Sequence, residues 1–107
     1  MYPLQDAETI RRRRELAPET LAAFKAFHES VFVDGALSAK TKQLIAVAIA
    51  HVTQCPYCIR GHTKDALKVG ATENEIMEAI WVAVEMRAGA AYAHSTIALE
   101  AMKRKEK

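Results

Sequence analysis

The stretch Leu44–His62 reads LIAVAIAHVTQCPYCIRGH and joins the longest apolar run of the chain to both of its cysteines. Residues 44–50 are apolar on every side of a helix, which is typical of a helix at the centre of a core rather than on a surface. Cys55 and Pro56 follow after a short gap, and proline is favoured in the first turn of a helix. The stretch therefore predicts two consecutive helices that meet at the cysteines.

Outward from this stretch, the apolar spacing and the capping residues predict further helices. We expect helical segments at about residues 6–16, 18–33, 39–52, 55–69 and 73–102. Serine is a favoured N-cap residue, so Ser38 is expected to begin a helix, and Gly70 is expected to end one as a C-cap. Thr72 and Glu75 have the spacing of a capping box, which marks the start of the last helix. Gly89 would kink the last segment, divide it in two or allow a close helix contact. Because the chain has only 4 glycines and 3 prolines to punctuate strands, it is predicted to be all-α, with five to six helices.

The length and the apolar content predict one domain that associates with itself. A chain of 107 residues that is 50% hydrophobic fits a single domain over residues 1–107, with an N-terminal helical arm at 1–17 and a frayed tail at 103–107. The second segment carries an apolar stripe, and the last is apolar on more than one face. The stripe residues are Leu21, Phe24, Phe27 and Val31. We expect the phenylalanines in the core, and association through the remaining apolar helix surface.

The charge pattern and the absence of targeting features bear on whether the protein binds nucleic acid or a membrane, and on its compartment. The net charge is only +2, and the basic run Arg11–Arg14 lies among acidic residues without interleaved aromatics, so no nucleic-acid partner is expected. The N-terminus lacks the apolar stretch of a secretory signal, and the apolar run at 44–50 is far below the roughly 18 residues that cross a membrane. We therefore expect a cytoplasmic protein with no membrane contact. Two neighbouring cysteines in a reducing compartment indicate catalysis or metal binding.

Cys55, Cys58 and His62 have the spacing of a redox-active dithiol with a base. At a helix N-cap, Cys55 meets free N–H groups and the helix dipole, which lower a thiol pKa. Cys58 lies one turn further on, within reach for a small disulfide. His62 follows Cys58 by four residues on the same face, where it would accept the thiol proton. Helix electrostatics favours Cys55 as the nucleophile and the neighbouring base favours Cys58, so the spacing leaves this choice open.

Other interpretations of these residues compete with the dithiol. The cysteines would be inert if both were simply buried beside a chance histidine. Zinc would need Cys55, Cys58 and His62 with His51 as a fourth ligand, but structural zinc sites usually draw their ligands from separated pairs. Haem attachment requires a histidine directly after the second cysteine, where Ile59 stands. We expect no metal and no cofactor.

Several of these motifs also carry a resemblance to a known family. They are Leu37–Lys42, Cys55–Cys58, His62–Lys64 and Gly70–Thr72, with a looser match through Glu75–Ala79. In them the chain resembles the carboxymuconolactone decarboxylase family, and within it the AhpD-like alkylhydroperoxidase branch. The resemblance implies an all-α fold that assembles into a homotrimer or homohexamer.

The resemblance also implies an activity and roles for the site residues. AhpD-like proteins reduce organic hydroperoxides, so Cys58 is expected to attack the peroxide, His62 to belong to a proton relay and Cys55 to form the disulfide. A lipoyl- or thioredoxin-like dithiol protein would then reduce that disulfide. Two alternatives remain: a dithiol binding or sensing module with weak peroxidase turnover, and a decarboxylase-type enzyme using His62 and His51. The decarboxylases of the family generally lack the cysteine pair.

One position departs from the pattern of the AhpD-like branch. Gln43 stands where these proteins carry a relay glutamate, and an amide cannot accept a proton. Gln43, Val47 and His51 share one stripe of a helix, so His51 would supply the missing base if that stripe faced the dithiol. His51 is equally well interpreted as a hydrogen-bonded core histidine. Glu85 in the last segment is a second candidate base.

Overall fold

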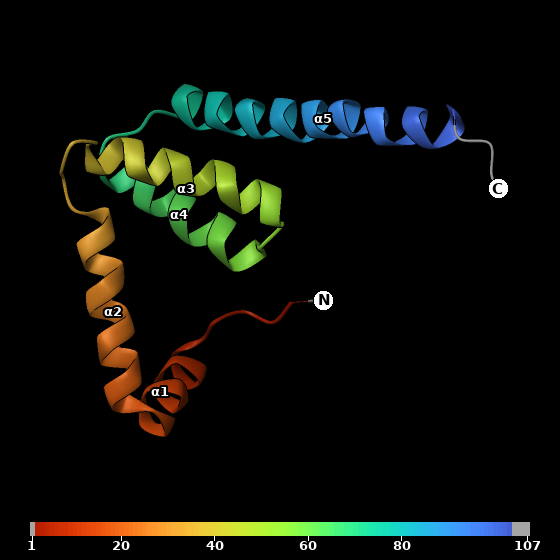
Figure 1. Cartoon of the computed structure of the whole chain (residues 1–107). Coiled ribbons are helices and arrows are strands. Elements are labelled where there is room, and N and C mark those ends of the chain that lie inside the picture. The colour runs from red at the N-terminus through yellow and green to blue at the C-terminus, as the bar shows by residue number, and fades with distance from the viewer. Residues whose placement is uncertain (1, 104–107) are drawn as a thin grey trace.

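The protein is a bundle of helices in which α3 is central (Figure 1). The computed structural model describes residues 2–103, and all regular structure in this range is helical. The helices are α1 (Ala7–Leu16), α2 (Pro18–Phe32), α3 (Ala39–Thr53), α4 (Pro56–Lys68) and α5 (Glu73–Lys103). The predicted all-α class is confirmed, and each predicted segment corresponds to one helix. Of the tail expected to fray, Lys103 is helical and residues 104–107 lie outside the described range.

The capping residues explain where the central helices begin and end. The Ser38 hydroxyl accepts the Thr41 N–H at 3.1 Å, as expected of the N-cap of α3. Thr72 and Glu75 form the predicted capping box, because each side chain accepts the backbone N–H of the other, at 3.1 and 2.9 Å. Helix α4 ends at Lys68, one residue earlier than predicted, and Gly70 takes a positive φ of 96° that few other residues adopt. These contacts are local in sequence, which is why sequence patterns could predict them.

Helix α5 passes through Gly89 without interruption. It is one helix over Glu73–Lys103 and looks straight in Figure 1, so the chain has five helices rather than six in the described range. A Cβ atom on Gly89 would meet only the Glu85 side chain of the same helix, at 3.5 Å, so no other helix approaches closely there. No helix in residues 2–103 combines the length and the apolar character needed to cross a membrane.

The core is small and lies where α3 packs against α4 and α5. Its buried residues are Val47, Ala66, Ala71 and Ile76, with Leu44 and Ile80 packed against them. Val47 is fully buried, which agrees with the predicted central position of α3. Ile45 and Ile49 on the same helix are nevertheless 43% and 54% exposed. The chain therefore covers only part of the apolar surface of α3.

Helices α1 and α2 project away from this core, and the molecule is extended (Figure 1). The radius of gyration is 19.1 Å, whereas a compact domain of this length has about 13 Å. Phe24 and Phe27 of α2 are 62% and 63% exposed, so the expectation that they lie in the core was wrong. The reason is that the backbone of α2 comes close only to α1 and the neighbouring α3, which leaves most of its apolar stripe uncovered.

Polar contacts fix both ends of α3. At its beginning, Lys40 pairs with Glu75 at 2.9 Å. The Glu75 carboxylate accepts the Thr72 N–H and the Lys40 hydrogen bond, and these interactions lower its pKa. At the other end, Arg87 donates to the Val52 carbonyl at 2.6 Å, one of the last carbonyls that a helix cannot satisfy itself. Helix α5 therefore contacts α3 through polar groups at both ends of α3, and these contacts fix the position of α3 relative to α5.

We expect Thr72→Ala to lower the free energy of unfolding by about 1 kcal/mol, because the Glu75 N–H loses its hydroxyl acceptor. Urea denaturation at a fixed protein concentration measures this loss. Thr96→Ala is the matched control, since Thr96 is exposed within α5 and caps nothing. An equal effect of both substitutions would contradict the stabilising role of the capping box.

Candidate dithiol site

The turn between α3 and α4 places the two cysteines. Helix α3 stops because Gln54 adopts a left-handed conformation with φ of 59°. Cys55 is the N-cap of α4 and Pro56 its first residue, as predicted. The Cys55 Sγ accepts the backbone N–H of Cys58 at 3.2 Å. A thiolate at this position thus takes the place of the side-chain oxygen that normally caps a helix.

The two thiols are electrostatically unequal. The pKa of Cys55 is lowered by the hydrogen bond from the Cys58 thiol and then by that from the Cys58 backbone N–H. The pKa of Cys58 is raised by its hydrogen bond to Cys55 and by burial. The first negative charge of the pair therefore lies on Cys55, while Cys58 keeps its proton.

His62 is oriented by Gln43 of α3. Its Nδ1 lies 2.8 Å from Oε1 of Gln43, a side chain that is buried. Because an amide oxygen only accepts hydrogen bonds, Nδ1 carries the hydrogen and Nε2 keeps its lone pair. Burial lowers the pKa of His62, with Asp65 acting in the opposite direction, so the imidazole is neutral at pH 7. Gln43 thus fixes the tautomer in which the lone pair of Nε2 is free.

Cys58 and His62 open into the same hollow, which has a volume of about 190 Å³. The rest of its lining comes from α3 and is almost entirely apolar: Ala46, Ile49, Ala50 and Thr53. Cys55 is not among the lining residues. The hollow therefore offers a small apolar group access to Cys58 beside a neutral imidazole.

The end of α2 also contacts His62. The Phe32 ring stacks on the imidazole with a centroid distance of 5.2 Å, and His28 lies 6.1 Å away. Sequence patterns did not reveal these neighbours. The spacing of His28 and Phe32 puts them on one face of α2, but nothing in the sequence shows that this face meets α4.

The other candidate residues lie elsewhere. The Nδ1 of His51 is 2.8 Å from the Val47 carbonyl of its own helix, and His51 does not line the hollow of Cys58 and His62. Its interpretation as a hydrogen-bonded histidine therefore agrees with its contacts better than a role as a base. Glu85 is exposed on α5. Within residues 2–103, no three His, Cys, Asp or Glu side chains converge as metal ligands would.

We expect Gln43→Glu to raise the pKa of His62 by about one unit or more, because a carboxylate beside Nδ1 stabilises the imidazolium. An NMR titration of the His62 ring protons measures this shift. Gln54→Glu is the control, since it adds the same charge at an exposed position. An unchanged titration of His62 in Gln43→Glu would show that the two side chains are not in contact.

Comparisons with known proteins place the chain in a family. The carboxymuconolactone decarboxylase family matches over residues 18–101. A Paracoccus denitrificans protein known as uncharacterized protein 4 in the cox locus is 69% identical over 77 residues, or 72% of this chain and 69% of its own length. A family member from Legionella pneumophila with a solved structure is 36% identical, with a TM-score of 0.72 over 90% of this chain and 86% of its own. Another from Thermotoga maritima, suggested to take part in an antioxidative response, is 26% identical with a TM-score of 0.56 over 76% of this chain and 93% of its own. The predicted resemblance is therefore confirmed, and the chain belongs to the carboxymuconolactone decarboxylase family.

Proposed function

We propose that the protein reduces organic hydroperoxides with Cys55 and Cys58, and that a partner dithiol protein reduces the resulting disulfide. One observation carries the proposal: the Cys58 thiol shares an apolar hollow with the neutral His62, while the Cys55 Sγ lies against the Cys58 N–H. A hydroperoxide reductase needs a nucleophile with a base beside it, and a second thiol close enough to form a disulfide.

In the first step, Nε2 of His62 accepts the proton of the Cys58 thiol. The thiolate sulfur attacks the outer oxygen of the hydroperoxide and the O–O bond breaks. The alkoxide leaves with the proton from the imidazolium as an alcohol, and Cys58 becomes a sulfenic acid. The apolar lining of the hollow suits the alkyl group of such a substrate.

In the second step, the Cys55 thiolate attacks the sulfur of the Cys58 sulfenic acid. The S–O bond breaks, the hydroxide takes a proton from solvent to leave as water, and the disulfide forms. The lowered pKa of Cys55 suits this role, because it favours the thiolate form of the resolving thiol. A lipoyl- or thioredoxin-like dithiol then attacks the disulfide and supplies the two electrons for the next cycle.

A dithiol sensing module with weak peroxidase turnover is the second candidate, and Gln43 is the observation that favours it. Gln43 can orient His62 but cannot pass a proton onward, so His62 would exchange protons with solvent alone. Such a module would form its disulfide readily, yet complete few cycles even with excess reductant.

Mass spectrometry of the thiols before and after one equivalent of cumene hydroperoxide tests the proposal. We expect rapid loss of two alkylatable thiols, mapped to a Cys55–Cys58 disulfide, and their return with dihydrolipoamide. Full alkylation after long exposure would exclude the peroxidase function. A disulfide that forms once, with negligible steady-state turnover, would favour the sensing module.

A further inference from the structure

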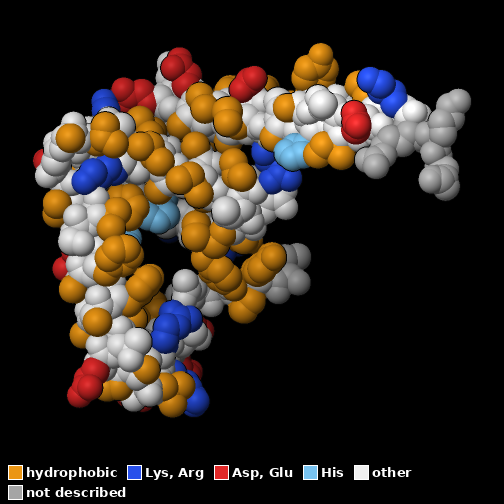
Figure 2. All heavy atoms as spheres, in the orientation of Figure 1, with side chains coloured by type: hydrophobic (Ala, Val, Ile, Leu, Met, Phe, Trp, Pro, Cys, Tyr) orange, Lys and Arg blue, Asp and Glu red, His pale blue; other side chains and the backbone are white. Residues whose placement is uncertain are grey.

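Phe32, the last residue of α2, covers one face of the His62 imidazole. The two rings stack, with a centroid distance of 5.2 Å and an interplanar angle of 28°. Phe32 is half-buried, whereas Phe24 and Phe27 on the same helix are 62% and 63% exposed. Figure 2 shows imidazoles, in pale blue, recessed in the angle between α2 and the rest of the bundle. The apolar surface of α2 therefore contacts the candidate site at Phe32.

Polar contacts in the connection after α2 fix the position of Phe32. The carbonyl of Val33, the next residue, accepts a hydrogen bond from the Lys42 Nζ at 2.7 Å. The carboxylate of Asp34 accepts the backbone N–H of Ala39 at 2.6 Å. Both donors belong to α3, so the end of α2 is held against the start of α3.

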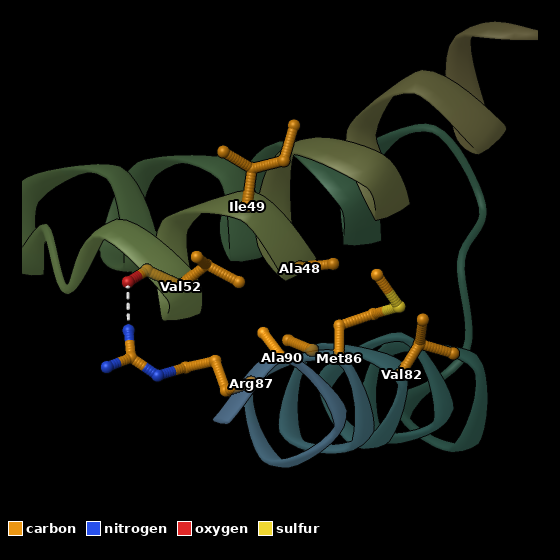
Figure 3. A pocket seen from close by; sticks show the side chains of 8 residues that line it. Ala48, Ile49, Val52, Val82, Met86, Arg87 and Ala90 are labelled. Atoms are coloured by element: carbon orange, nitrogen blue, oxygen red, sulfur yellow. Dashed lines mark hydrogen bonds between the residues drawn. The ribbon is translucent and has the colours of Figure 1, made fainter. Parts of the chain in front are cut away.

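Helix α3 is also held by α5. Figure 3 shows the hydrogen bond from Arg87 of α5 to the Val52 carbonyl as a dashed line, and its length is 2.6 Å. Apolar side chains of both helices line the groove beside this bond. The contacts of α3 with α2 and with α5 therefore fix the positions of Phe32 and Gln43 relative to each other.

Gln43 and Phe32 restrain the imidazole in different ways. Gln43 accepts the hydrogen of Nδ1 at 2.8 Å, which fixes one atom of the ring. A hydrogen bond at one atom leaves the ring free to turn about χ2, a torsion whose energy wells are broad in histidine. A ring stacked on the face opposes this rotation, and aromatic rings at such a centroid distance attract each other. The two contacts together hold the imidazole in one orientation.

We propose that Phe32 is a positioning residue, which keeps Nε2 of His62 directed at the Cys58 thiol and shields the imidazole from water. Phe32 does not line the hollow of Cys58 and His62, so it acts through His62 and not on the substrate. This role deepens the proposed function and rests on it for the use of His62 as a base. The shielding is measurable without a hydroperoxide, so the two proposals can fail separately.

Removal of the Phe32 ring should raise the pKa of His62. Burial is the largest influence on this pKa and lowers it, because a buried imidazolium loses its hydration. The titratable groups that face His62 come from α4 and α2 and are Cys58, Asp65 and His28. Asp65 raises the pKa of His62 and His28 lowers it, and both remain in Phe32→Ala. The contact from α3 is the neutral Gln43, so the loss of burial decides the direction of the change.

NMR titration of the His62 ring protons tests the shielding. We expect Phe32→Ala to raise the pKa of His62 by about half a unit, because water then reaches the uncovered face. Phe32→Tyr keeps an aromatic ring at this position and should keep the wild-type pKa. Phe24→Ala is the matched control, since it removes the same side chain from an exposed position of α2. An unchanged pKa in Phe32→Ala, or an equal rise in Phe32→Tyr or Phe24→Ala, would overturn the proposal.

Stopped-flow oxidation of Cys58 by cumene hydroperoxide tests the orientation of the base. At pH 8 His62 is neutral with or without Phe32, so the rate reports the position of Nε2 and not its protonation. We expect Phe32→Ala to react about tenfold more slowly than the wild type, because a displaced base accepts the thiol proton less well. Phe32→Tyr and Phe24→Ala should keep the wild-type rate.

Phe32→Leu keeps the test decisive if Phe32→Ala does not fold. Leucine fills much of the space without a planar ring, so this variant should also react more slowly than the wild type. Wild-type rates in the folded Phe32→Ala or Phe32→Leu protein would overturn the positioning role. A wild type that does not react at all would instead overturn the proposed function, and the titration of His62 would still decide whether Phe32 shields the imidazole.

Discussion

Cys58→Ser is expected to lower steady-state hydroperoxide reduction by more than about 1,000-fold, because the substitution removes the nucleophile of the first step. Cys58 lines the apolar hollow beside His62, and in the proposed mechanism the hollow admits the substrate and His62 accepts the thiol proton. A coupled assay with cumene hydroperoxide and dihydrolipoamide measures the loss. The fold should persist, because the variant keeps the backbone N–H of residue 58 that the Cys55 Sγ accepts to cap α4.

Cys55→Ser is the matched comparison and separates the roles of the two thiols. Steady-state turnover should also be lost, but Cys58 should still react once and leave a sulfenic acid that dimedone traps. Dimedone labelling of Cys55 in Cys58→Ser, with none on Cys58 in Cys55→Ser, would reverse the assignment. The lowered pKa of Cys55 makes this a real alternative, so the two single variants are measured together.

His62→Ala is expected to slow the first step by about 100-fold, the usual contribution of a general base. Stopped-flow measurement of thiol oxidation between pH 5 and 8 gives both the rate and its pH dependence. A base works in its neutral form, and burial lowers the pKa of His62 from its usual value near 6.5. The wild-type rate should therefore hold as the pH falls to about 6.5 and decline below it as the imidazole is protonated. The rate of His62→Ala should not show this decline.

His94→Ala is the control for His62→Ala. His94 lies exposed on α5, where its Nδ1 is 2.8 Å from the Ala90 carbonyl of its own helix. It should keep the wild-type rate and pH profile. If His62→Ala kept both as well, the proton of Cys58 would have to leave by another route, and a base at His62 would be excluded.

The sequence predicted those features that depend on neighbouring residues. The caps at Ser38, Cys55 and Thr72 each involve hydrogen bonds that span three residues, so the residue types and their spacing were sufficient. The bond between His62 and Gln43 spans 19 residues and depends on how α3 packs on α4. The sequence could mark Gln43 as unusual, but it could not show that its side chain orients the imidazole.

The apolar stripe of α2 shows a different limit of sequence patterns. The spacing of Phe24 and Phe27 predicts an apolar face correctly, yet it does not state whether the chain itself or another molecule covers that face. In the structure the chain does not cover it. The position of His51 was also ambiguous in the sequence. Because His51 shares a helix stripe with Gln43, it was a candidate base for the dithiol, but in the structure its ring lies against the Val47 carbonyl of its own helix.

The cap that Cys55 provides for α4 has a thermodynamic consequence for the partner protein. The thiolate form gains the hydrogen bond from the Cys58 N–H and the favourable helix dipole, whereas a disulfide sulfur is neutral and benefits less. Any interaction that stabilises the dithiol over the disulfide raises the reduction potential of the pair. The disulfide should therefore be a comparatively strong oxidant, so that even a mildly reducing dithiol would return the protein to its active form.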